Sequence, residues 1–302
     1  MSLQYEPTVF DKRSERFMEI NGKTKLMGLI GNPVEHTLSP VIHNTIAESM
    51  SENMVYVPFP VKEDIASAIK GAYALGIQGM NITVPYKSDA IPCLAQIDKE
   101  AAIIGAVNTL VRVDGGYKGF NTDLPGLYRA LLSEGIEVKG NKVIIVGAGG
   151  AARAAAFMCA FNEAERLVIL NRTVEKAQRI MDEVCEKTGF SNINVMPIAD
   201  YMRIEGEDWL VLQATKVGLY PNVDDTPIAD PEFFKKAAVV YDLIYTPQET
   251  MFMRLAKQQG VAAYNGLKML LYQGIAAYEM WNGVSVPEEV VEKAYQALQS
   301  KI

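Results

Sequence analysis

Strand-like apolar runs alternate with amphipathic helical segments in the first third of the chain. A helical pattern begins near Ser39-Pro40, where serine can cap a helix and proline suits its first turn, and a second covers Lys62 to Leu75. The strand-like runs are Lys25 to Ile30, Met54 to Val61 and Gly79 to Val84. Strands that alternate with helices predict a parallel sheet with helices on both faces.

The rest of the chain begins with a hairpin and then returns to the alternating pattern. Val107 to Val113 and Tyr117 to Asn121 flank Asp114-Gly115-Gly116, which predicts a hairpin because aspartate and glycine tolerate positive φ. A helix follows from about Leu124 to Glu134. Further strands are expected at Lys142 to Val146, Leu167 to Leu170, Val195 to Ile198, Leu210 to Ala214 and Val239 to Leu243, and final helices at Leu267 to Trp281 and Pro287 to Gln299.

This order of elements predicts an α/β protein with two domains. Residues 1–122 and 265–302 form an α/β substrate domain, to which the C-terminal helices return. Residues 123–264 form a Rossmann-type, doubly wound nucleotide-binding domain. The length of 302 residues agrees with two domains of ordinary size.

The composition is that of a globular protein and narrows its partners. Hydrophobic residues make up 49% and charged residues 22%, which allows a sizeable core. A net charge of -7 argues against nucleic acid or an anionic membrane, because both need a concentrated cationic surface, but a small anionic ligand stays open. Cys93, Cys159 and Cys185 have neither disulfide nor zinc-site spacing, so no metal is expected.

The opening residues MSLQYEPTVFDKRSERF have the pattern of neither a signal peptide nor a membrane span. We interpret them as a leader outside the fold and expect a cytoplasmic protein. The sequence leaves open whether the protein is a monomer or a homodimer.

A glycine-rich turn between a buried strand and a helix is the strongest chemical signal. In Gly147-x-Gly149-x-x-Ala152, the first glycine allows the tight turn, the second lets the backbone approach a pyrophosphate, and the alanine keeps helix and strand close. The helix start at Gly150 and Ala151 presents free N–H groups and a positive dipole to the phosphates. We therefore predict a dinucleotide site, with a tight turn that binds no ligand as the alternative.

The end of the next strand favours NADP over NAD. An NAD enzyme normally carries Asp or Glu there for the ribose hydroxyls, whereas this chain has Asn171, Arg172 and Thr173, followed by Lys176. Their donors suit a 2′-phosphate, which an acidic residue would repel. Solvated charges at the start of a helix are the alternative interpretation.

Polar residues of the first domain predict a second, adjoining site. Lys87 follows the buried strand that contains Asn81, near the mouth where α/β sheets bind ligands, and could exchange a proton with a hydroxyl or ketone. Asn108, Thr122 and Asp123 lie in the hairpin arms and where the chain crosses between domains, so they could bind a polyol. Taken singly, the lysine is a surface charge and the Asn-Thr-Asp stretch a helix cap.

Ordered motifs run through nearly the whole chain. They are Gly31-Asn32-Pro33-Val34 with His36-Thr37-Leu38-Ser39-Pro40, Asn81 to Lys87, Gly105-Ala106-Val107-Asn108-Thr109, Asn121-Thr122-Asp123, Gly147 to Arg153, Asn171-Arg172-Thr173, Tyr241-Asp242-Leu243-Ile244-Tyr245, and Asn265-Gly266-Leu267-Lys268-Met269-Leu270. In this combination the chain resembles the shikimate dehydrogenase family, including its quinate/shikimate branch, from about Lys25 to the C-terminal helices.

The resemblance implies a role for each site residue. Lys87 and Asp123 would form the catalytic pair beside the reacting hydroxyl. The substrate would be held at its carboxylate by Thr37 and Ser39, at its ring hydroxyls by Asn81, Thr83 and Asn108, and around these by Thr122, Tyr245 and Gln273. Gly266 would lie near the nicotinamide, and Thr215 would also contact the cofactor.

The chain departs from the family pattern at several positions. Thr37 stands where serine is usual, and its extra methyl group narrows the carboxylate site. The preference of the enzyme for shikimate or for quinate therefore stays open. Lys268 replaces a glycine expected near cofactor and substrate. Gln213 replaces asparagine and Lys216 replaces serine in the segment after a strand of the second domain.

The implied reaction is the NADPH-dependent reduction of the ring ketone of 3-dehydroshikimate, with Lys87, held by Asp123, protonating or stabilising the emerging oxygen. For His36 and His43 we expect a packed or surface position and no role as proton carrier. Two rivals stay open. One is a quinate/shikimate dehydrogenase that uses NAD, and the other is a non-catalytic relative that binds nucleotide or shikimate.

Overall fold

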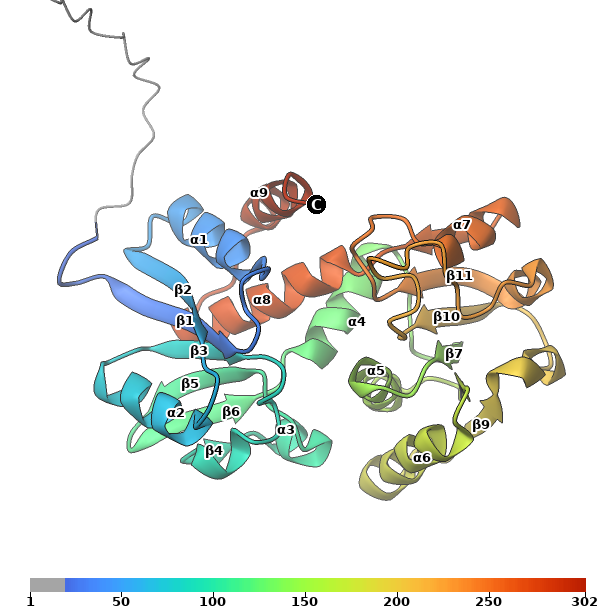
Figure 1. Ribbon diagram of the computed structural model, residues 1–302, viewed down its shortest axis with the longest axis horizontal. Coiled ribbons are helices and arrows are strands. Elements are labelled where there is room, and N and C mark those ends of the chain that lie inside the picture. Colours follow the sequence, from blue (N-terminus) through green and yellow to red (C-terminus); the bar gives the residue numbers. More distant parts are fainter. Residues whose placement is uncertain (1–19) are drawn as a thin grey trace, which may run out of the picture.

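The structure, a computed structural model, describes residues 20–302, which form two six-stranded sheets. The expected leader lies outside the described residues. Figure 1 shows the two sheets side by side, with helices α4 (Asp123–Ser133) and α8 (Leu267–Asn282) running between them. These two helices pack against each other, so they form the connection between the two halves of the molecule.

The first sheet is mixed, with strand order β2-β1-β3-β5-β6-β4. β1 pairs in parallel with β2 and β3, as the alternating pattern predicts. The expected hairpin is also confirmed, and it continues the sheet in the antiparallel sense. The strands are β1 (Lys25–Gly31), β2 (Met54–Pro60), β3 (Gly79–Ile82), β4 (Gln96–Ile97), β5 (Thr109–Val113) and β6 (Gly116–Phe120).

Helices cover this sheet, and the C-terminal helix returns to it by packing against α1 (Figure 1). They are α1 (Ser39–Ser49), α2 (Ile65–Ala74), α3 (Lys99–Ile104), α9 (Glu288–Gln299) and the 3-10 helix η1 (Ile91–Cys93). The expectation that Ser39 caps α1 is wrong, because Leu38 holds the cap position and Ser39 is already helical. The serine hydroxyl is therefore not used as a cap.

The second sheet is all parallel, with strand order β12-β11-β10-β7-β8-β9, and confirms the Rossmann-type fold. The apolar residues of its central strands β7, β8 and β10 are buried, as a sheet covered on both faces requires. The strands are β7 (Lys142–Val146), β8 (Arg166–Asn171), β9 (Ile193–Pro197), β10 (Trp209–Gln213), β11 (Ala237–Asp242) and β12 (Ala262–Tyr264). The helices are α5 (Gly150–Phe161), α6 (Val174–Thr188), α7 (Met251–Gln258), η2 (Ile198–Arg203) and η3 (Pro231–Lys236).

The strand order reverses between β7 and β10, because the chain passes from β7 to β8 on one side and later returns to β10 on the other. Ligands of doubly wound sheets bind at such a switch point, beyond the carboxyl ends of the strands. Gly147 follows β7 and Ala214 follows β10 at this edge. Within residues 20–302, no helix has the length and apolar character needed to cross a bilayer.

Candidate active site

Two adjoining cavities lie between the sheets. The first, which we call the lysine pocket, has a volume of about 400 Å³ and contains Lys87 and Asp123. The second, the glycine pocket, has a volume of about 1070 Å³ and contains the turn after β7. The cavities share the lining residues His36, Thr37, Leu38, Ala151, Leu243 and Tyr245, so a ligand in one can contact a ligand in the other.

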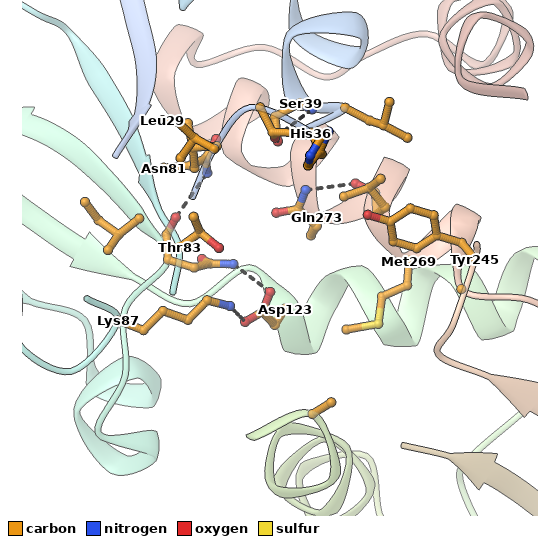
Figure 2. Close-up of a pocket in the computed structure, with 18 of the residues that line it drawn as sticks. Leu29, His36, Ser39, Asn81, Thr83, Lys87, Asp123, Tyr245, Met269 and Gln273 are labelled. Atoms are coloured by element: carbon orange, nitrogen blue, oxygen red, sulfur yellow. Dashed lines mark hydrogen bonds and ion pairs between the residues drawn. The ribbon is translucent and has the colours of Figure 1, made fainter. Parts of the chain in front are cut away.

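Lys87 and Asp123 form an ion pair in the lysine pocket (Figure 2). Lys87 follows β3 and Asp123 opens α4, and the Nζ atom lies 2.5 Å from Oδ2 of the carboxylate. The second carboxylate oxygen, Oδ1, accepts a hydrogen bond of 2.8 Å from Nδ2 of Asn108. Both side chains are partly exposed to the cavity, at 32% and 19%, so the ammonium group can donate its other hydrogens to a ligand.

Asn108 is fixed by residues behind the pocket. Its Oδ1 atom accepts hydrogen bonds from the backbone N–H of Thr122 at 2.7 Å and from the hydroxyl of Thr109 at 3.0 Å. Because a backbone N–H can only donate, the amide orientation is settled and Nδ2 must face Asp123. Thr122 itself is fully buried and lines neither cavity, so the structure places it behind Asn108.

The other residues that the resemblance assigns to the substrate converge on the same cavity (Figure 2). They are Thr37, Ser39, Asn81, Thr83, Tyr245 and Gln273, with the cofactor residue Gly266 beside them. The Thr37 hydroxyl donates to the Ser39 hydroxyl at 3.2 Å. The apolar walls, which sequence reasoning missed, include Leu29, Val34, Met269 and Leu270, because an apolar pocket residue cannot be told from a core residue by sequence.

The glycine turn has the shape and free donors that a pyrophosphate needs. Gly147 has φ +117°, and a Cβ atom there would lie 2.9 Å from Cγ2 of Thr215, so a side chain is excluded. Around Gly149 and Gly150, by contrast, a Cβ atom would meet nothing within 4 Å among the described residues. Among residues 20–302 no side chain caps α5, so its first N–H groups are available to an anion.

The residues proposed for the 2′-phosphate lie beyond this turn. Asn171 lines the glycine pocket, and its side chain donates to the backbone oxygen of Thr173 at 2.8 Å. Arg172, Thr173 and Lys176 are exposed and line neither cavity. Within the described part of the chain, Arg172 forms no salt bridge. Their contact with the cofactor therefore stays a prediction.

The unusual Gln213 supports the floor of the glycine pocket. This fully buried side chain accepts a hydrogen bond from the N–H of Thr215 at 2.5 Å and donates to Oδ1 of Asp242 at 3.2 Å. Burial raises the pKa of Asp242 to about 6, although hydrogen bonds from Thr250, Ile244 and Gln213 oppose the rise. The pair joins the loops that follow β10 and β11, and these loops carry Thr215 and Tyr245.

The two unusual lysines occupy different environments. Lys216 lines the glycine pocket, next to Thr215. Lys268 lines neither cavity, and its Nζ atom instead lies 2.6 Å from Oε1 of Glu134. A long side chain is therefore accommodated at position 268 without entering the site.

The two histidines also differ. His43 is fully buried and stacks on Tyr56 with ring centroids 4.2 Å apart, and burial lowers its pKa to about 3. It is a packed histidine, as expected. His36 lines both cavities. Within residues 20–302, no group of three or more His, Cys, Asp or Glu side chains is arranged to hold a metal ion.

Fold and site together define a dinucleotide-dependent oxidoreductase with a separate pocket for a small polar substrate. Three family models match the chain: the shikimate dehydrogenase substrate binding domain over residues 29–110, shikimate / quinate 5-dehydrogenase over 130–217, and the shikimate 5'-dehydrogenase C-terminal domain over 266–294. The chain belongs to the shikimate dehydrogenase family.

Individual relatives are similar to this chain over nearly their full length. A shikimate dehydrogenase (NADP(+)) of Methanothermobacter thermautotrophicus is 40% identical over 93% of this chain and 99% of its own. One from Methanocaldococcus jannaschii is 43% identical over 91% of this chain and 97% of its own. A crystal structure of a shikimate dehydrogenase in complex with NADP+ is 41% identical, with a TM-score of 0.84 over 94% of this chain and 98% of that one.

Proposed function

We propose that this chain is an NADP-dependent shikimate dehydrogenase, which reversibly reduces 3-dehydroshikimate to shikimate. The observation that supports this most strongly is the Lys87–Asp123 pair, which lies in a polar pocket adjoining an open glycine turn. Membership of the family and relatives named shikimate dehydrogenase (NADP(+)) support both the substrate and the cofactor.

The pocket offers complementary groups for a hydroxylated ring carboxylate. The hydroxyls of Thr37 and Ser39, already 3.2 Å apart, would donate to the carboxylate. Asn81, Thr83 and Asn108 would orient the ring hydroxyls from the side of the first sheet. Thr122, Tyr245 and Gln273 would complete the site, with Thr122 acting through Asn108.

Lys87 would act as the acid in the reduction. When the ring ketone gains a hydride, negative charge develops on its oxygen, and an ammonium group beside it can donate a proton or stabilise the charge. Asp123 holds the ammonium group in place, and general acid–base help of this kind is worth about 100- to 10,000-fold in rate. NADPH, when bound, supplies the hydride.

The glycine pocket would hold the dinucleotide. Gly147, Gly149, Gly150 and Ala151 would contact the pyrophosphate, and Thr215 and Gly266 would contact the part next to the substrate. Asn171, Arg172, Thr173 and Lys176 would surround the 2′-phosphate of the adenosine end. No acidic residue stands among these four to favour NAD.

We also propose that the domain boundaries fall where expected, with residues 1–122 and 265–302 in the substrate domain and 123–264 in the nucleotide domain. The positions of the two sheets and of the starts of α4 and α8 support this division. The oligomeric state, monomer or homodimer, is left to a measurement of mass in solution.

A two-cofactor, two-substrate kinetic panel tests the function. NADPH and NADH oxidation would be measured with 3-dehydroshikimate and with 3-dehydroquinate as substrates. We expect kcat/KM to be highest for NADPH with 3-dehydroshikimate. A preference for NADH with 3-dehydroquinate would favour the quinate branch, and ligand binding without turnover would favour a non-catalytic relative.

A further inference from the structure

Tyr56 lies behind the lysine pocket and has no role in the mechanism above. It stands on β2, is 2% exposed and lines neither cavity. One face of its ring stacks on His43. Its hydroxyl donates a hydrogen bond of 2.8 Å to Oδ1 of Asn81, a residue that does line the pocket. Tyr56 therefore touches the site from outside it.

The Tyr56 hydroxyl acts as a donor under all ordinary conditions. Burial raises its pKa well above the usual range, and the neighbouring Ser39 side chain opposes the rise only in part. A protonated hydroxyl has one hydrogen to donate, and Oδ1 of Asn81 is the acceptor that this hydrogen reaches. Nδ2 of Asn81 donates at 3.1 Å to the backbone oxygen of Asn108, so the tyrosine hydroxyl and this carbonyl together hold the two ends of the Asn81 amide.

A buried series of hydrogen bonds continues from Asn81 to the Asp123 carboxylate. With Oδ1 of Asn81 bound to Tyr56, Nδ2 donates at 3.1 Å to the Thr109 hydroxyl. The same hydroxyl donates its one hydrogen to Oδ1 of Asn108 at 3.0 Å. Nδ2 of Asn108 then donates to Asp123, which binds Lys87. Every donor in this series of hydrogen bonds points toward the Asp123 carboxylate.

We propose that Tyr56 is a positioning residue for the reaction proposed above, which holds Asn81 firmly in place and, through the hydrogen bonds of Thr109 and Asn108, strengthens the hold on the Asp123 carboxylate that binds Lys87. The proposal rests on the proposed function. It assigns Tyr56 no contact with substrate or cofactor. It predicts that the single oxygen atom of its hydroxyl affects kcat, although the residue lies outside the pocket.

The protein contains a second buried tyrosine that serves as a matched control for this test. Tyr278 is also fully buried, and its ring centroid lies 6.5 Å from that of the same His43. Its hydroxyl has no hydrogen-bond partner among residues 20–302. Tyr56→Phe and Tyr278→Phe therefore remove the same atom from the same aromatic cluster, but only the first removes a hydrogen bond to the site.

Steady-state kinetics with NADPH and 3-dehydroshikimate, measured across pH, test the proposal. For Tyr56→Phe we expect kcat to fall about tenfold, as the loss of one buried hydrogen bond implies, with the KM for NADPH unchanged. The acid limb of the kcat–pH profile should move to higher pH, because a less firmly hydrogen-bonded carboxylate is protonated more easily. Tyr278→Phe should leave kcat and the profile within twofold of the wild type.

Thr109→Val removes the next hydroxyl in the same series of hydrogen bonds, and it serves as the second variant if Tyr56→Phe does not fold. It should reproduce the fall in kcat, and the double variant should lose no more than the larger single loss. Wild-type kcat and an unmoved pH profile in either folded single variant would overturn the proposal, as would an equal loss in Tyr278→Phe. Absence of wild-type turnover would instead overturn the proposed function, and the positioning role with it.

Discussion

The ammonium group of Lys268 lies 2.6 Å from the carboxylate of Glu134, and this pair joins the start of α8 to the end of α4. Both groups are largely shielded, at 23% and 19% exposure. The two helices are the elements that run between the sheets (Figure 1). The lysine that replaces the family's usual glycine therefore helps to connect the two halves of the molecule.

We predict that Lys268→Ala lowers stability without impairing the site. The free energy of unfolding should fall by about 1 kcal/mol, the scale of a partly exposed ion pair. kcat and both KM values should stay within about twofold, because Lys268 lines neither cavity. A double-mutant cycle with Glu134→Ala isolates the pair, and a coupling energy of zero would show that it contributes nothing.

Arg172→Ala should weaken the use of NADPH selectively. We expect its KM for NADPH to rise about tenfold or more, from the loss of a charge-assisted contact with the 2′-phosphate, with the KM for NADH unchanged. Arg179→Ala is the matched control, because Arg179 is also exposed but lies within α6, whereas Arg172 precedes that helix. Equal changes for both nucleotides would remove Arg172 from 2′-phosphate recognition.

Thr37 should be needed for its hydroxyl more than for its methyl group. Thr37→Val removes the donor and should raise the KM for 3-dehydroshikimate by about tenfold, whereas Thr37→Ser should leave it nearly unchanged. Because serine also widens the site, Thr37→Ser should increase kcat/KM for 3-dehydroquinate. Steady-state kinetics with both substrates check this, and similar behaviour of the two variants would argue against a carboxylate contact.

Asp242 should make stability depend on pH in a defined window. Its pKa is raised from 3.8 to about 6, so the folded state holds the proton more tightly than the unfolded state does. The resulting stabilisation is full below about pH 4 and is lost as pH rises through 6, with an upper limit of about 3 kcal/mol. Chemical unfolding of the wild type and of Asp242→Asn from pH 4 to 8 measures the difference between their free energies of unfolding. If the pKa of Asp242 is unshifted, this difference should not change with pH.

The sequence predicted the fold well because the strands of the second sheet are apolar, short and separated by helices. The expected strands of that sheet agree with β7 to β11 within a few residues. β12 and α7 were not expected. A strand of three residues is too short to show a periodic pattern, and the helical pattern of α7 was not recognised after the long loop that precedes it.

The site was less completely predictable. Lys87 and Asn81 stand near the end of one strand, which is a pattern visible in sequence, but their meeting with Asp123 depends on the mixed sheet and on the start of α4. The hydrogen bond from Tyr56 to Asn81 joins β2 to β3, which lie on either side of β1 in the sheet and are separated by a helix in the sequence. No local pattern distinguishes Tyr56 from an ordinary core tyrosine.

The central claim is that Lys87, held by Asp123, serves the reduction of the substrate ketone, and one comparison tests it most directly. kcat for NADPH oxidation with 3-dehydroshikimate would be measured for the wild type and Lys87→Ala, alongside shikimate binding by calorimetry. The account predicts that Lys87→Ala binds shikimate within about tenfold of the wild type while kcat falls at least about 100-fold. An unchanged kcat in Lys87→Ala would contradict it.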